Sequence, residues 1–275
     1  MRKEFANLFK EARKNRSDLT LLLGDISVGL FQEDVPDRSS ELIDGVFNLG
    51  ILEQSMISIA AGMAAGGRLP IVHTISPFII ERALEQIKLD LTYNLNKVIL
   101  VSANGPFEYK KLGVTHHCSN DVPLLSLYND INIYCPYSVP DMSDCFYKAL
   151  HSDNSSYLRL SNLDAVSLEV PSSLSLVAAN QTDLSILEVF VGEASRLAGK
   201  TPFLRSSCKF VSDVSGFDLS LLEGFSKVVF YEPYSAPILG IRYLRRVGDV
   251  SGVELLSYPK RLDGVFDGFE LVHHR

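Results

Sequence analysis

Apolar residues near the start of the chain recur at intervals of three and four positions. Within residues 3–14 they are Phe5, Leu8, Phe9 and Ala12, the spacing of one face of an amphipathic helix. Residues 19–23 then form a continuous apolar run, which predicts a buried strand. Residues 27–45 are polar and contain Pro36, so we expect a surface loop there.

Strands and helices alternate through the following part of the chain. Short apolar runs predict strands at 69–74, 97–102, 131–134 and 157–160. Helices are predicted at 53–66, 77–93 and 140–151, and Asp121 is placed to cap a further short helix. Residues 104–119 contain two glycines and a proline, which is typical of a loop. This alternation predicts an α/β fold built on a doubly wound, mainly parallel sheet.

The composition changes near residue 162, where the chain becomes rich in serine and loses its regular pattern. We therefore predict a first domain at 1–165, a linker at 166–183 and a second, smaller α/β domain at 184–275. The second domain is expected to contain strands at 185–191, 209–212, 227–231 and 253–257. Helices are expected near 193–199 and 236–246.

Composition and charge exclude several classes of protein. The 275 residues are 46% hydrophobic and 21% charged, with a net charge of −7, which argues against a surface for nucleic acid or anionic membranes. We find no apolar run of bilayer-spanning length and no signal-peptide core in the charged N-terminal segment. The four cysteines lack paired metal-ligand spacing, so reduced thiols and a cytoplasmic location are the expectation.

Residues 48–66 combine a polar start with an apolar helix rich in alanine and glycine. Glu53 falls in the first turn, where the partial positive charge of the helix N-terminus stabilises a carboxylate. A poorly hydrated carboxyl group there would have a raised pKa and could remain protonated as a hydrogen-bond donor. The residues alone leave two interpretations open, a catalytic acid and a glutamate that only stabilises the helix.

Three ordered motifs carry a resemblance to a known family. Residues 48–66 resemble the pyrimidine-binding (Pyr) domain of the transketolase family, in which G-I-x-E-Q opens a helix of small residues. Residues 77–87 are similar to the family's F-x-x-x-R-A-x-x-Q-I, and residues 113–117 are similar to G-x-T-H-Q. The resemblance extends to about Asn162 and implies thiamine diphosphate as the cofactor. Related enzymes include 1-deoxyxylulose-5-phosphate synthase and the β subunits of 2-oxo acid dehydrogenases.

The resemblance implies which residues bind the cofactor. Glu53 would hydrogen-bond N1′ of the aminopyrimidine ring and so activate the cofactor. Phe78 would stack against that ring, and an ordinary core phenylalanine is the alternative. Ile51, Gln54 and Ile75 would complete the wall around the ring.

The resemblance also implies a set of substrate-binding residues. His116 matches the histidine that reaches the reacting carbon, and His117 stands where glutamine is usual. His73 is a further candidate, and Asn104 stands where transketolases have another histidine. Arg82 would orient a substrate oxyanion or phosphate, or else form an ion pair with Glu81 or Glu85 on its own helix. The adjacent His116, His117 and Cys118 would bind one metal ion poorly, so we expect no metal ligands in this chain.

Departures from the family pattern point to a divided enzyme. In the family, a G-D-G motif and an asparagine at a fixed spacing after it hold Mg²⁺ and the diphosphate. This chain has no such combination. The chain therefore resembles the C-terminal subunit of a split transketolase. An N-terminal-type subunit would hold the diphosphate and Mg²⁺, in an expected α2β2 assembly.

Substrate specificity is expected to differ from that of ordinary transketolases. By the resemblance, Leu112 stands where transketolases have an aspartate that recognises a sugar hydroxyl, and only Arg159 lies near the place of their phosphate-binding arginine. Our main hypothesis is a transferase subunit that moves a two-carbon ketol unit between sugar-type substrates. The alternatives are an enzyme with a 2-oxo acid donor and a catalytically silent interaction subunit.

Overall fold

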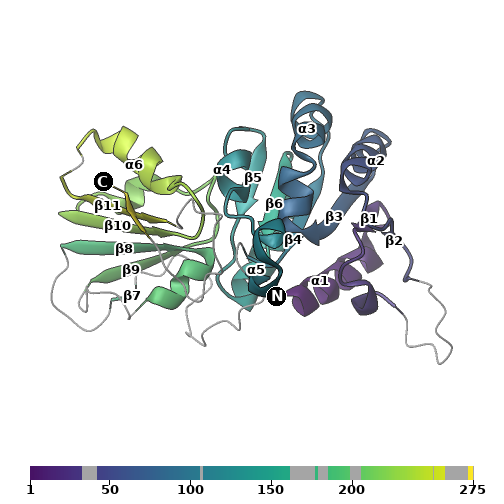
Figure 1. Ribbon diagram of the computed structural model, residues 1–275, viewed down its shortest axis with the longest axis horizontal. Coiled ribbons are helices and arrows are strands. Elements are labelled where there is room, and N and C mark those ends of the chain that lie inside the picture. Colours follow the sequence, from purple (N-terminus) through teal and green to yellow (C-terminus); the bar gives the residue numbers. More distant parts are fainter. Residues whose placement is uncertain are drawn as a thin grey trace.

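The computed structural model describes residues 1–32, 42–105, 108–161, 177–178, 185–198, 206–249, 251–257 and 272–274. Within these residues the chain forms two six-stranded sheets that lie side by side (Figure 1). Helices cover both faces of the first sheet, and most neighbouring strands in both sheets are parallel. The predicted fold class, a doubly wound α/β sheet followed by a smaller α/β unit, is confirmed.

The first sheet is wholly parallel. Its strands, in spatial order, are β2 (Val46–Asn48), β1 (Leu19–Leu23), β3 (Leu69–Ile75), β4 (Ile99–Ala103), β6 (Ser155–Arg159) and β5 (Ile131–Tyr134). The central strands are buried along their whole length, as expected for a sheet covered by helices on both faces. All parallel carboxyl ends meet at one edge of the sheet, where ligand sites form in folds of this kind.

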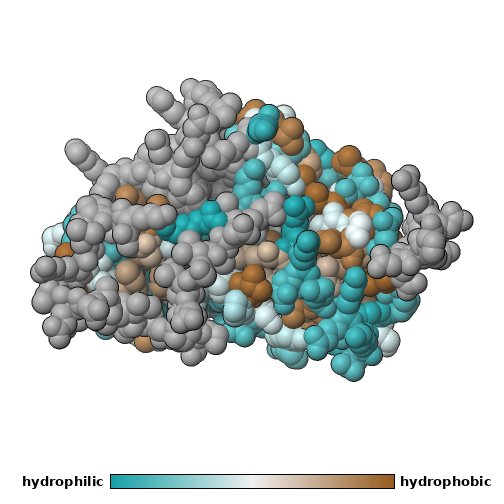
Figure 2. All heavy atoms as spheres, turned by 90° about the horizontal axis from the view of Figure 1, so that it is seen from below, coloured by the Kyte–Doolittle hydropathy of each residue, from teal (hydrophilic) through white to brown (hydrophobic). Residues whose placement is uncertain are grey.

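Two helical layers enclose this sheet (Figure 1). On one face lie α1 (Arg2–Asn15) and α5 (Val139–His151), whose apolar side chains share one core cluster with the sheet. On the other face lie α2 (Glu53–Ala65), α4 (Asp121–Leu125) and the segment between β3 and β4. Figure 2 views the molecule from the side of α1, where hydrophilic side chains gather on the surface of that helix. The predicted amphipathic N-terminal helix is therefore confirmed.

The segment between β3 and β4 differs from the single helix predicted at 77–93. It consists of the π-helical segment η2 (Pro77–Glu81), a short α3 (Leu84–Gln86) and the π-helical segment η3 (Ile87–Tyr93). Ala83, with φ −107° and ψ 19°, interrupts the helical path between the first two. Two 3-10 segments lie within predicted loops, η1 (Val28–Leu30) and η4 (Lys110–His116).

The second sheet has the order β12-β11-β10-β8-β9-β7. Its strands are β7 (Val177–Ala178), β8 (Ile186–Val191), β9 (Ser207–Val211), β10 (Lys227–Glu232), β11 (Val253–Ser257) and β12 (Val272–His274). The four central strands match the four predicted from sequence, and the two edge strands pair antiparallel. The helical segments are η5 (Gly192–Leu197), η6 (Leu219–Leu222) and α6 (Leu239–Val247).

The two sheets meet beside β5, at the edge of the first sheet. The Cys135 amide donates to the Ser212 carbonyl at 2.7 Å, and the Val214 amide donates to the Ile133 carbonyl at 2.9 Å. One apolar cluster runs through this junction and includes buried residues of β5, β8 and β10. Most of the predicted linker at 166–183 lies outside the described residues, so its boundaries stay a prediction. In the part of the chain that the structure describes, no helix has the length and apolar character needed to cross a bilayer.

Candidate functional site

The carboxyl ends of β2, β3 and β4 bring four sequence-distant segments to one edge of the first sheet. Glu53 follows β2, Phe78 and Arg82 follow β3, and Asn104 follows β4 directly. The loop after Asn104 leads through η4 to His116. Parallel topology therefore gathers polar groups that lie far apart in the sequence.

The turn before α2 fixes the position of Glu53. The Asn48 side-chain oxygen accepts hydrogen bonds from the Asp25 amide at 3.0 Å and the Gly50 amide at 3.3 Å. Gly50 has a φ of +76°, which would be strained in a residue with a side chain. Helix α2 begins at Glu53, whose side chain is 2% exposed and lies at the positive end of the helix dipole.

The two carboxylate oxygens of Glu53 have different surroundings. Oε2 accepts a hydrogen bond from Nη1 of Arg82 at 2.7 Å. Oε1 is buried and has no hydrogen-bond partner among the described residues. An unsatisfied buried acceptor costs about 1–3 kcal/mol, so this oxygen is available to a donor outside the described residues. The alternative in which Arg82 pairs with Glu81 or Glu85 does not match the structure, because the guanidinium pairs with Glu53 instead.

Aromatic contacts extend this pair into a cluster. The guanidinium carbon of Arg82 lies 4.2 Å from the centre of the Phe78 ring, a cation–π contact. The His116 ring meets Phe78 edge to face, with centroids 5.2 Å apart, and the Tyr109 ring centroid lies 5.8 Å from that of the same histidine. Glu53, Arg82, Phe78 and His116 thus form a continuous chain of contacts, which we call the Glu53 cluster.

A glycine positions the histidine of this cluster. Gly113, with φ 72° and ψ −159°, breaks the helical path of η4 just before Thr115 and His116. The Thr115 hydroxyl and Nδ1 of His116 are 2.9 Å apart and share a hydrogen bond. This contact orients the ring and leaves Nε2 for another partner.

Asn104 is an unusual residue at the same edge of the sheet. Its side chain is 1% exposed, and neither its oxygen nor its nitrogen forms a hydrogen bond with any described residue. Its backbone is left-handed, with φ +77°, and its carbonyl accepts from the Ser76 hydroxyl at 3.0 Å. Strained backbone and unsatisfied buried amides are both costly, and they persist where a site requires them.

The remaining predicted site residues divide into two groups. Ile51 is 64% exposed, Gln54 is exposed, and Ile75 is partly buried at the end of β3, and their part in a cofactor site stays a prediction. His117 is buried next to His116, and burial lowers the pKa of its imidazole.

His73 does not join the cluster. It is fully buried, with Nε2 bonded to the Ser27 hydroxyl and Nδ1 to the Val101 carbonyl, both at 2.9 Å, and it packs against Phe5. Burial lowers the pKa of His73 to about 4, so its ring is neutral at physiological pH. This placement puts the His73 ring against Phe5 of α1 and apart from the Glu53 cluster, and its role in substrate binding stays a prediction.

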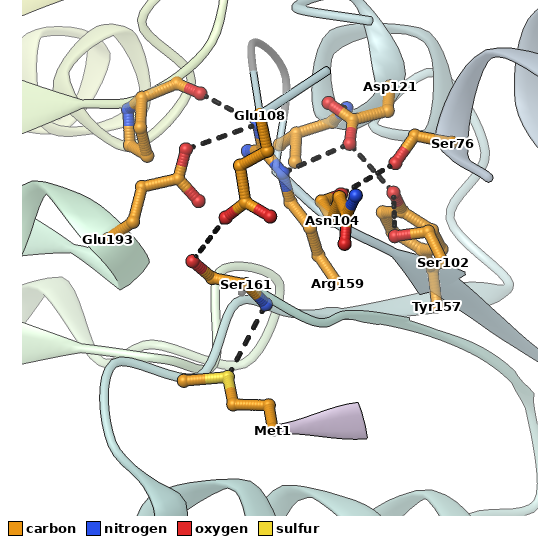
Figure 3. A network of polar contacts seen from close by, with 12 residues as sticks. Met1, Ser76, Ser102, Asn104, Glu108, Asp121, Tyr157, Arg159, Ser161 and Glu193 are labelled. Carbon is orange, nitrogen blue, oxygen red and sulfur yellow. Dashed lines mark hydrogen bonds and ion pairs between the residues drawn. The ribbon is translucent and has the colours of Figure 1, made fainter. Parts of the chain in front are cut away.

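Sequence reasoning missed a buried polar network around Arg159 (Figure 3). Arg159 is 1% exposed, its Nε lies 3.2 Å from Asp121, and its Nη2 donates to the Pro233 carbonyl at 2.9 Å and lies 3.8 Å from Glu193. Tyr157 donates to the same Asp121 carboxylate at 2.7 Å. The guanidinium is buried among these partners, and its Nε and Nη1 form no hydrogen bond with any described residue. The sequence signal for this network was the arginine within the strand predicted at 157–160.

Comparison with known proteins decides the family. The transketolase pyrimidine-binding domain matches residues 1–165, more than half of the chain. The chain belongs to this transketolase family. Enzymes of the family use thiamine diphosphate.

Several transketolase-family proteins are similar to this chain. A subunit of the apulose-4-phosphate transketolase of Actinobacillus succinogenes is 33% identical over 156 residues, which are 55% of this chain and 48% of that protein. 1-Deoxy-D-xylulose-5-phosphate synthase of Treponema pallidum is 28% identical over 228 residues, 77% of this chain and 35% of the synthase. The chain spans about half the length of the apulose-4-phosphate transketolase subunits that it matches.

Solved transketolases share the fold. A split-gene transketolase, an inactive β4 tetramer, superposes with a TM-score of 0.78 at 18% identity, covering 96% of this chain and 89% of that one. Transketolase from Leishmania mexicana gives a TM-score of 0.68 at 20% identity over 85% of this chain and 38% of its own. The second sheet of this transketolase-family chain therefore also lies within the shared fold.

The described residues do not bring a set of metal ligands together. The described residues contain no group of three or more His, Cys, Asp or Glu side chains placed to hold an ion. Cys118, beside the two histidines, is buried, and burial raises the pKa of its thiol well above the usual value. At neutral pH it is a thiol and not the thiolate that metals prefer.

The buried network predicts a pH dependence of stability. Burial raises the pKa of Glu193 to about 7, although Arg159 acts in the opposite direction. A carboxyl group whose folded pKa is raised stabilises the fold at low pH and loses that contribution as pH rises through about 7. Between about pH 5 and pH 8, the unfolding free energy of the natural chain should fall relative to that of Glu193→Gln by about 2 to 3 kcal/mol. Urea unfolding of both chains across this pH range measures the two unfolding free energies. If both depended on pH in the same way, the prediction would be contradicted.

Proposed function

We propose that this chain is the pyrimidine-binding subunit of a split, thiamine-diphosphate-dependent transketolase, and that a partner subunit completes its active site. The observation that supports this most directly is the Glu53 carboxylate at the start of α2. It is buried, one oxygen is held by Arg82, and the other has no partner among the described residues. This is the arrangement that a ring nitrogen of a bound cofactor would complete.

The chain's own residues fit the aminopyrimidine of thiamine diphosphate. Glu53 would hold a ring nitrogen through Oε1, and Phe78 would pack against the ring, with Ile51, Gln54 and Ile75 around it. When bound, the cofactor supplies the carbon nucleophile that the reaction needs. Glu53 would hydrogen-bond a ring nitrogen and exchange a proton with it, which is general acid–base catalysis by a carboxyl group in direct contact with the reacting ring.

Substrate would meet the other end of the cluster. His116, fixed by Thr115 through Nδ1, would use Nε2 to exchange a proton with a substrate oxygen. Asn104 would offer its unsatisfied amide to a substrate hydroxyl or carbonyl. Arg82 would keep Glu53 in place and is partly exposed, so it could also meet an anionic group.

A partner subunit would supply what this chain lacks. The diphosphate and Mg²⁺ would be held mainly by that partner, which we expect to be an N-terminal-type transketolase subunit in an α2β2 assembly. Apolar side chains next to the Glu53 cluster are exposed, which is typical of a surface that another chain covers. They are Phe47, Ile51, Leu52, Leu112 and Val114, each at least half exposed.

The proposed reaction is transfer of a two-carbon ketol unit between sugar-type substrates. The apulose-4-phosphate transketolase subunit and the 6-deoxy-6-sulfo-D-fructose transketolase subunit of Clostridium are both among the relatives, and the names of both include transketolase. The second candidate is a 2-oxo acid donor, favoured by Leu112 in place of the sugar-recognising aspartate and by the similarity to 1-deoxy-D-xylulose-5-phosphate synthase.

Reconstitution tests this proposal. The chain should copurify with a partner that carries the G-D-G motif, and thiamine diphosphate with Mg²⁺ should bind the complex at least tenfold more tightly than it binds this chain alone, since the diphosphate is the partner's ligand. Donor assays of the complex should then show turnover of ketoses. Turnover of pyruvate without any ketose would replace the first candidate by the second.

A further inference from the structure

A second cavity, of about 470 Å³, lies at the junction of the two sheets and away from the Glu53 cluster. One wall comes from the segment after α4 and from β5, with Leu127, Tyr128 and Ile133. The opposite wall comes from the second sheet's unit, with Ile238 and Ile241 of the α6 region. In Figure 1, α4 and α6 lie on the same upper side of this junction. The volume is within the range of about 300–1,000 Å³ that small-molecule sites occupy.

The charge of this cavity has one sign. Arg242 and Arg245 line it, and none of the described residues in its lining is aspartate or glutamate. This contrasts with the net charge of the whole chain, which is −7. The larger cavity between α5 and β9, of about 690 Å³, is lined by charges of both signs and indicates no class of ligand.

The two arginines of the cavity have different partners. Nη1 of Arg242 donates to the Val214 carbonyl at 2.6 Å, which holds that side chain along the cavity wall. Arg245 is exposed and forms no hydrogen bond or ion pair with any described residue. The next residue, Arg246, does not line the cavity and instead pairs with Glu223 at 2.8 Å. Arg245 is therefore a cation at the cavity whose charge is not compensated by the described residues.

The walls are held in place before any ligand arrives. The buried Glu232 carboxylate accepts hydrogen bonds from the amides of Ile238, Leu239 and Gly240, each at 2.9 Å, and so anchors the first turn of α6. The bond from Val214 to Ile133 joins the two walls at the base. A preformed site of this kind binds without the cost of ordering its walls.

We propose that this cavity binds a small organic anion that combines an apolar body with an anionic head. The apolar body would pack between Leu127, Ile238 and Ile241, and the head would meet Arg245 and Arg242. Because the two walls belong to different units, an occupied cavity would stabilise their junction, and the stabilisation would grow with the logarithm of the ligand concentration above the dissociation constant. This site is independent of the proposed thiamine diphosphate chemistry.

The absence of tryptophan from the chain gives a direct test. The change Leu127→Trp, at a side chain that is 73% exposed, places a single reporter at the cavity. Titration of this full-length chain with 8-anilinonaphthalene-1-sulfonate should produce energy transfer from the introduced tryptophan to the bound probe. The uncharged analogue N-phenyl-1-naphthylamine should bind about tenfold more weakly, because it cannot make the charge-assisted contact.

Two neighbouring substitutions separate recognition from general charge effects. In the Leu127→Trp background, Arg245→Glu should raise the dissociation constant of the sulfonate about tenfold, whereas Arg246→Glu, with the same charge change, should leave it unchanged. Neither substitution should alter binding of the uncharged analogue or the melting temperature without ligand. Equal effects of the two substitutions, or no energy transfer from the introduced tryptophan, would overturn the proposal.

Discussion

Glu53→Gln should lower the turnover of the assembled complex by about 10²–10³-fold and leave its assembly intact. Glutamine has nearly the same shape, and its side-chain oxygen can still accept from Arg82, which now holds Oε2 at 2.7 Å. It cannot share a proton with a ring nitrogen, so the loss falls on cofactor activation. Steady-state kinetics and size-exclusion chromatography of the complex measure the two quantities.

The matched control for this experiment is Glu85→Gln. Glu85 is an exposed glutamate on α3, close in sequence to Arg82, and it forms no ion pair with a described residue. The same chemical change there should leave turnover within a factor of two of the natural complex, because surface substitutions have small effects (about 0.5 kcal/mol or less). If Glu53→Gln retained full turnover, the chain would be a silent interaction subunit.

Arg159→Met should destabilise the chain by about 3–5 kcal/mol. Methionine keeps much of the volume of the arginine stem, but it leaves the buried carboxylates of Asp121 and Glu193 without their cation. Burial without a partner is costly, and protonation of Glu193 is the main relief. The loss should therefore be larger at pH 8 than at pH 6, and urea unfolding at both values measures it.

Arg246→Met provides the comparison. Its ion pair with Glu223 has a length of 2.8 Å, but both side chains are about half exposed. Exposed pairs contribute only about 0–1 kcal/mol, so this change should barely move the urea midpoint. A loss for Arg159→Met no larger than that for Arg246→Met would show that the enclosed network is not a source of stability.

Sequence periodicity predicts most of the fold, because strands and helices depend mainly on the pattern of apolar residues within each short segment. Strand β1 and strand β5 match their predicted ranges because short apolar runs bounded by polar residues have few alternatives. The helix expected at 77–93 is only partly correct, because the structure interrupts it at Ala83, in a segment that packs against α2 and α4. Periodicity carries no signal for such a break.

The candidate site is harder to predict than the fold. The spacing of the motifs suggests Glu53, Phe78 and His116, and the structure brings these three together. Spacing does not reveal that Arg82 bridges Glu53 and Phe78, since the contact with Glu53 joins residues twenty-nine positions apart. His73 resembles a site residue in the sequence, but only the tertiary structure shows that its strand turns this side chain towards Phe5.

The apolar cluster that passes from β5 into β8 and β10 has a consequence for how the chain can be divided. A fragment ending near Ser161 would expose apolar side chains at one edge of the first sheet to water. Arg159 would also lose its hydrogen bond to the Pro233 carbonyl. Such a fragment would be prone to self-association. The unit built on the second sheet thus shields the apolar edge of the first sheet from water.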